Sequence, residues 1–221
     1  MTIKLCIGTC CELGRARFPG QSFVAVADKG GKPVAGSLLP AEASVRPLDF
    51  DVPPTWDIAA HEAAHAVVAI LNGMDVQRVE VGALASMTPG EFRNVTNGAL
   101  IKVLLAGIAA QNKSFRHEYR MRDADILEFV YAVRIGRGGG CDFCRVAQVI
   151  APLDDNAAVM VWRKFEADTL ELINLPAVWR AIRNIATLLM ERRELTGTEV
   201  REAMMAAGID LDAEHKELCN A

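Results

Sequence analysis

The sequence has no run of basic residues, no long apolar segment and no convincing signal peptide. Each absence limits the partners and the cellular compartment that we expect for the protein. The net charge of −4 comes from 24 basic and 28 acidic side chains, so neither nucleic acid nor an anionic membrane surface is an expected partner. The longest uninterrupted apolar stretches, residues 66–71 and 103–110, are too short to span a bilayer. The opening residues, MTIKLCIGTCCELG, make a poor signal peptide because cysteines interrupt a short apolar run. We therefore expect a cytoplasmic protein without a membrane partner.

Proline is scarce after residue 56, and this divides the chain in two. Residues 1–56 hold six of the nine prolines and six glycines, and both residue types disfavour helix. We expect this part to form an extended N-terminal arm. The remaining residues, 57–221, belong to a chain that is 51% hydrophobic and can bury a substantial core. We expect a mainly α (α+β) domain there, with a small β element and a C-terminal helical bundle.

The most informative stretch is residues 57–73, DIAAHEAAHAVVAILNG. Between Ile58 and Leu71 every residue is apolar except His61, Glu62 and His65, so a helix here would be apolar on all sides and buried. Buried imidazole and carboxylate groups are costly unless they are paired or bound to a metal. The three polar residues therefore indicate a site.

Their spacing indicates zinc. Residues four apart lie one above the other on a helix, so His61 and His65 can offer two imidazole nitrogens to one ion. Glu62 then lies beside the ion, where it can accept a proton from a water that zinc has acidified. This is the HExxH arrangement of zinc peptidases. Asp57 is the expected N-cap of the helix, and Gly73 fits the left-handed residue after its end.

After this helix, residues 76–81 (VQRVEV) place Val79 and Val81 on one face, as in a half-buried strand. A strand in this position is well placed to pair with an extended peptide substrate, and an equally good interpretation is a strand that simply ends a small sheet. Residues 83–97 are interpreted as a loop. Further helices are predicted at residues 98–111, at 123–135, from 142, at 156–174, at 177–193, and after the capping-box pair Thr196 and Glu199, ending at Gly208.

A catalytic zinc needs three protein ligands and an open position, so one more ligand must come from outside the helix. The extended motif HExxHxxGxxH is excluded, because Val68 and Leu71 stand where it needs a glycine and a histidine. The residues alone leave several candidates open for the third ligand. These are Asp142, Asp125, a cysteine such as Cys141 or Cys144, a glutamate, and His117.

Several segments resemble the peptidase domain of the FtsH family of ATP-dependent zinc proteases. The motif HEAAHA matches that family's HEAGHA, LAGIAAQ (105–111) is similar to its GRAAE, GGGCDF (138–143) to its GASNDI, and LLMERRELTGTEV (188–200) to its leucine-rich helix followed by ETLDGEEI. The likeness covers about residues 57–207. It implies a zincin-like helical peptidase domain in which the aspartate of the glycine loop, here Asp142, is the third zinc ligand.

The cysteines suggest a second, structural site. Without a secretory signal the six cysteines are expected to be reduced. Cys6, Cys10 and Cys11 could nevertheless join Cys141 and Cys144 in a structural zinc site, although the spacing of the first group fits no known zinc knuckle.

Together these features predict a zinc-dependent endopeptidase that cuts unfolded or flexible polypeptides, with metal ligands His61, His65 and Asp142 and with Glu62 as general base. The chain has no P-loop, so we expect cleavage independent of ATP. The expected partner is a polypeptide substrate, and a homo-oligomer is compatible with the sequence. The alternatives are a peptidase that cleaves one regulatory protein and a non-catalytic peptide-binding module on a degenerate peptidase fold.

Overall fold

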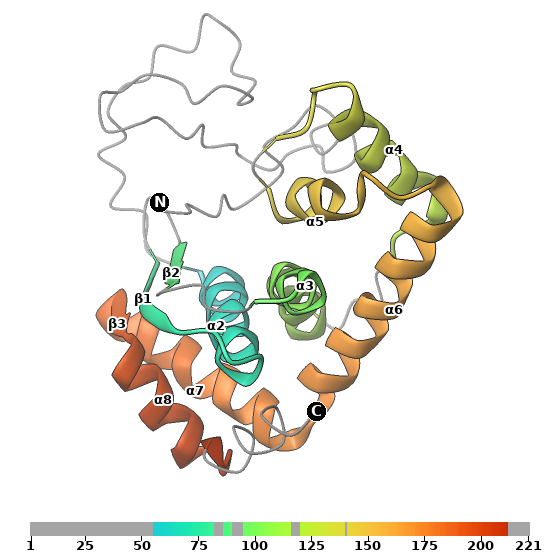
Figure 1. Ribbon diagram of the computed structural model, residues 1–221. Helices are drawn as coiled ribbons and strands as arrows, with labels where there is room; N and C mark the ends of the chain where they lie inside the picture. Colours follow the sequence, from blue (N-terminus) through green and yellow to red (C-terminus); the bar gives the residue numbers. More distant parts are fainter. Residues whose placement is uncertain (1–54, 82–85, 90–94, 116–119, 140, 212–221) are drawn as a thin grey trace, which may run out of the picture.

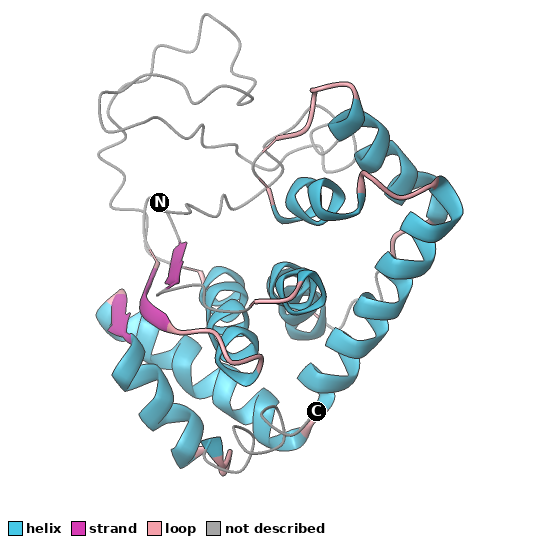
Figure 2. Ribbon diagram, viewed as in Figure 1, coloured by secondary structure: helices cyan, strands magenta, loops and turns pink. Residues whose placement is uncertain are grey.

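The computed structural model describes residues 55–81, 86–89, 95–115, 120–139 and 141–211. Within these ranges helices dominate and the strands form one small sheet (Figure 2). The predicted fold class, mainly α with a small β element, is confirmed. Almost all of the predicted N-terminal arm, residues 1–56, lies outside the described residues, so the division into arm and domain stays a prediction.

Helix α2 (Trp56–Leu71) contains the HExxH residues and is packed between other helices (Figure 1). It contacts α3 (Asn97–Ser114) and α7 (Pro176–Arg192) most extensively. Small side chains make this possible, and five alanines have no exposed surface: Ala59, Ala60, Ala63, Ala64 and Ala66. The polar residues of α2 are therefore buried among apolar neighbours, where an unpaired polar group is costly.

The predicted ends of α2 are partly right. Gly73 has φ +73°, the left-handed conformation expected after the helix end. The predicted N-cap, Asp57, is wrong, because the N-cap is Thr55, whose side chain makes no capping hydrogen bond. Asp57 lies instead in the first turn, where its negative charge interacts favourably with the positive end of the helix dipole.

The sheet has the order β2-β1-β3 and is antiparallel throughout. Strand β1 (Val76–Glu80) lies between β2 (Ser86–Pro89) and β3 (Glu194–Thr196). The prediction that β1 pairs with a peptide substrate is therefore wrong, because both of its edges are already paired. Strand β2 also corrects the prediction of a loop at residues 83–97.

A register shift in β1 explains the irregular alternation of its sequence. The pairing with β2 shifts between Val76 and Arg78, so Val76 and Val79 are both buried although they are three residues apart. Such a bulge places two consecutive residues, Gln77 and Arg78, on the exposed side.

The remaining helices enclose α2 and α3. Helices α4 (Asp123–Arg134) and α5 (Asp142–Ile150) pack on one another, and α5 also contacts α3. The long helix α6 (Asp155–Asn174) runs along α3 and α4, as Figure 1 shows. The described part of the last third of the chain is mainly helical, as predicted, and its helices pack around α2 and α3.

The last helix of the described ranges is α8 (Gly197–Ala206), which packs on α7. The predicted capping box is present, since Thr196 accepts from the Glu199 backbone N–H and Glu199 accepts from the Thr196 backbone N–H. Gly208 has φ +89° after the helix end, as expected. In the described ranges no helix is both long enough and apolar enough to cross a membrane.

Candidate metal centre

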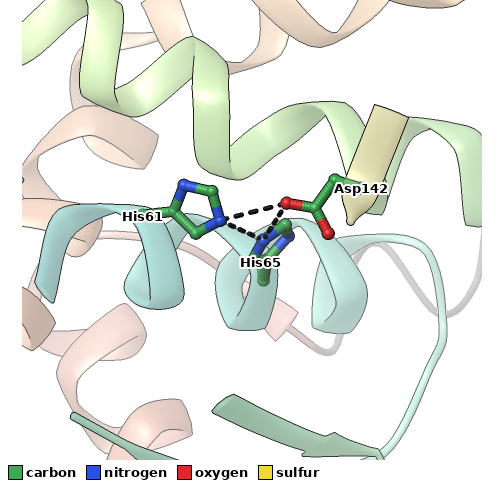
Figure 3. Close-up of side chains that lie close together, drawn as sticks. All are labelled: His61, His65 and Asp142. Carbon is green, nitrogen blue, oxygen red and sulfur yellow. Dashed lines mark hydrogen bonds and ion pairs between the residues drawn. The ribbon is translucent and has the colours of Figure 1, made fainter. Parts of the chain in front are cut away.

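Three buried side chains from two distant segments meet at one point (Figure 3). His61 and His65 project from one face of α2, and Asp142 projects toward them from the first turn of α5. Oδ2 of Asp142 lies 3.1 Å from Nε2 of His61 and 3.4 Å from Nε2 of His65, and the two Nε2 atoms are 2.9 Å apart. None of the three side chains is more than about 6% exposed.

The opposite nitrogens of both rings are held by α3. Nδ1 of His65 lies 2.6 Å from the backbone carbonyl oxygen of Val103, and Nδ1 of His61 lies 3.0 Å from Oε1 of Gln111. A carbonyl oxygen only accepts, so each Nδ1 carries a proton and donates it. In a neutral imidazole the other nitrogen, Nε2, then presents a lone pair.

This arrangement requires a positive charge at the centre. The two Nε2 lone pairs and the Asp142 carboxylate are all acceptors and lie within 3.4 Å of one another, so they repel unless a proton or a cation lies between them. Ligand atoms about 2.1 Å from a tetrahedral zinc ion are about 3.4 Å apart. The observed separations are close to that value, and the two-imidazole, one-carboxylate donor set suits zinc.

Glu62 lies beside this cluster and has no exposed surface. Neither of its side-chain oxygens has a hydrogen-bond partner among the described residues, and the same holds for Oδ1 of Asp142. A buried carboxylate without a partner costs stability, and such groups often mark functional sites. The unused oxygens leave Glu62 able to accept a proton from a water or ligand at the cluster.

The electrostatics are those of closely coupled buried groups. Burial disfavours a charged imidazole, yet the hydrogen bond and charge of Asp142 outweigh it and raise the pKa of His61 to about 9. Burial raises the pKa of Glu62 to about 7, even though His61 and His65 oppose the shift. Burial would also raise the pKa of Asp142, but the two histidines hold it well below its usual range. At neutral pH the metal-free cluster therefore holds a proton that a metal ion would displace.

Helix α5 brings Asp142 to the cluster. Cys141 is the N-cap and Asp142 the first residue of the helix, a position at which a carboxylate is stabilised by the helix dipole. The next residue, Phe143, anchors the turn, with its ring centroid 5.4 Å from that of Phe129 and 5.8 Å from that of Trp162. The aromatic contacts thus tie the orientation of Asp142 to the core formed by α4 and α6.

Gly107 of α3 makes the close approach of the rings possible. A Cβ atom at this position would lie 2.5 Å from Nε2 of His61 and 2.5 Å from Nε2 of His65, distances that no side chain tolerates. The absence of a side chain at Gly107 therefore lets α3 pack closely against α2.

The other candidates for the third ligand lie elsewhere or outside the described residues. The Asp125 carboxylate is bound by the Arg122 guanidinium at 3.0 and 3.1 Å and does not belong to the cluster. Cys141 and Cys144 are buried near Asp142 but are not part of the cluster either. His117, like Cys6, Cys10 and Cys11, lies outside the described residues, so the structural zinc site stays a prediction.

Two contributors to the centre were not predicted as such. Gln111 appeared in the sequence only as part of a family-like motif, and Val103 only as part of an apolar run. A signal for Gln111 was present, because it is four residues after Gly107 and therefore on the same face of α3. The Val103 contact uses a backbone carbonyl, which has no sequence signature.

The chain matches no protein-family model, and no curated protein is significantly similar to it. The resemblance to the FtsH family therefore stays a prediction.

Proposed function

We propose that the protein is a zinc-dependent endopeptidase that hydrolyses peptide bonds in unfolded or flexible polypeptides without ATP. The observation that carries the proposal is the convergence of His61, His65 and Asp142 on one point, with the unpartnered carboxylate of Glu62 beside it. A purely structural cluster would not need a fourth buried polar group, since an alanine at position 62 would pack without the cost of desolvation.

His61, His65 and Asp142 would hold the ion. Bound zinc would supply Lewis acidity, which polarises a peptide carbonyl and makes water more acidic. Glu62 would accept the proton of the attacking water and pass it to the leaving amine.

The first experiment measures zinc per chain by elemental analysis in the wild type and in His65→Ala. The second measures cleavage of unfolded casein by the wild type and by Glu62→Gln, with and without ATP. We expect one zinc per wild-type chain, lost in His65→Ala. We expect Glu62→Gln to keep its zinc and to lose cleavage by about 10²-fold or more, and ATP to have no effect.

A matched control is Glu128→Gln, which makes the same change at an exposed position of α4 and should leave both zinc and cleavage unchanged. Zinc binding together with full cleavage by Glu62→Gln would overturn the assignment of the general base. Zinc binding without any cleavage by the wild type would favour the non-catalytic peptide-binding module. Cleavage of one protein but not of casein would favour the regulator-cleaving peptidase.

A further inference from the structure

Three residues of α3 contact the two histidine rings from one side. Val103, Gly107 and Gln111 follow one another at intervals of four and share a helix face. Val103 accepts from Nδ1 of His65, Gly107 leaves room for both Nε2 atoms, and Gln111 accepts from Nδ1 of His61. This face of α3 thus touches both rings without supplying a ligand atom.

The two contacts differ in kind. His65 is oriented by a backbone carbonyl in the middle of a helix, a group that substitution of the side chain does not remove. His61 is oriented by a side-chain amide, which reaches it from the last turns of α3. The orientation and tautomer of His61 therefore depend on the identity of one residue.

We propose that Gln111 is a positioning residue for His61, an inference that depends on the proposed zinc site. Its side-chain carbonyl holds the proton on Nδ1 and so directs the Nε2 lone pair toward His65 and Asp142. Partners of this kind fix the tautomer and ring orientation of metal-binding histidines, and losing one typically weakens metal binding 10-fold to 100-fold.

The test compares zinc dissociation constants, measured by chelator competition at one fixed pH, for the wild type, Gln111→Met and Gln111→Glu. Methionine has a similar length but no strong acceptor, and we expect zinc binding about 10-fold to 100-fold weaker. Glutamate keeps the acceptor, and we expect binding at least as tight as in the wild type. Gln77→Met changes an exposed glutamine of β1 and should leave zinc binding unchanged.

A second readout reports on the ring itself. Nitrogen and proton NMR of zinc-loaded, histidine-labelled protein should show the Nδ1 proton of His61 protected from exchange with water in the wild type and in Gln111→Glu. In Gln111→Met, where this proton has no acceptor, we expect it to exchange faster. A thermal unfolding curve for each metal-free variant separates loss of positioning from loss of the fold.

The inference is overturned if Gln111→Met binds zinc as tightly as the wild type, or if the Nδ1 proton of His61 stays equally protected from exchange in that variant. It stands without the proposed peptidase function if zinc binding depends on Gln111 while the wild type cleaves nothing. A wild type that takes up no zinc would overturn both.

Discussion

Gly107 lies against the edge of His65 that faces the cluster, and a Cβ atom at this glycine would be 2.5 Å from His65 Nε2. We predict that Gly107→Ala displaces both imidazoles, because the same atom would lie equally close to His61 Nε2. Overpacking of a buried site typically costs about 1–3 kcal/mol. The expected result is loss of most zinc together with a lower free energy of unfolding, measured by elemental analysis and by urea titration.

A helix usually gains stability when glycine is replaced by alanine, so the direction of this effect is diagnostic. Lys102→Ala, a change to a half-buried residue of the same helix, should keep its zinc. An intact zinc site in Gly107→Ala would show that the rings do not approach α3 as described.

The two aspartates proposed as third ligand should behave differently. Asp142→Ala removes a group that faces both histidines, and we expect zinc affinity to fall by at least 100-fold, since a second-shell partner alone accounts for 10-fold to 100-fold. Asp125→Ala removes a partner of Arg122 that does not belong to the cluster, and we expect zinc to remain bound while stability falls by about 1–3 kcal/mol. Isothermal titration with zinc and urea unfolding distinguish the two, and the reverse pattern would make Asp125 the ligand.

The metal-free protein should lose stability as pH rises from 5 to 9. The pKa of Glu62 is raised from 4.5 to about 7, so the folded state favours the protonated carboxyl, and this contribution is lost between those values. The pKa of His61 is raised from 6.5 to about 9, so its contribution is complete below 6.5 and is lost by about pH 9. Each difference, 9 − 6.5 and 7 − 4.5, corresponds to about 3 kcal/mol.

Because the two groups interact, we expect their combined effect to be smaller than the sum of the two. The measurement is the urea midpoint in the presence of a strong chelator at several pH values. Glu62→Gln should remove the decrease between pH 4.5 and 7 and leave the later one. A midpoint that rises toward pH 9 would contradict the described pairing of His61 with Asp142.

Gly197, at the start of α8, should tolerate no side chain. Its added Cβ would lie 1.7 Å from the backbone carbonyl oxygen of Val76, so Gly197→Ala must separate α8 from β1. We expect a loss of about 2–4 kcal/mol in the free energy of unfolding, with zinc still bound below the unfolding temperature. Thr198→Ala, at the neighbouring exposed position, should have little effect, and a wild-type melting temperature in Gly197→Ala would refute the close contact.

The helices and the donor set could be predicted because strong local signals mark them. Three polar residues in an apolar helix identified His61, Glu62 and His65, whereas the residues alone left the third ligand open and the resemblance of GGGCDF to a family motif implied Asp142. The structure brings the side chains of His61, His65 and Asp142 together. The capping box at Thr196 is equally local, since both of its hydrogen bonds join residues three apart.

Contacts between distant backbone groups could not be predicted. The pairing of β1 on both edges depends on β3, a strand of only three residues more than 100 positions later in the chain. The N-cap of α2 was assigned to Asp57 because aspartate is a good capping residue, yet the helix begins at Trp56, and its N-cap is Thr55, whose side chain makes no capping hydrogen bond. The contact of Val103 with His65 leaves no trace in the sequence, because any residue has a carbonyl.

Asp142 and His61 are separated by 81 positions in the chain, so an ion held by both closes a long loop. Closing such a loop costs conformational entropy during folding. An ion bound to both residues stabilises the closed loop, so that the loop opens less often. Removal of the metal should therefore affect α5 first. We expect α5 to detach from the core more often while α2 and α3 remain packed. Hydrogen exchange should show this as faster exchange of the α5 amides on chelation, with α2 amides still among the slowest.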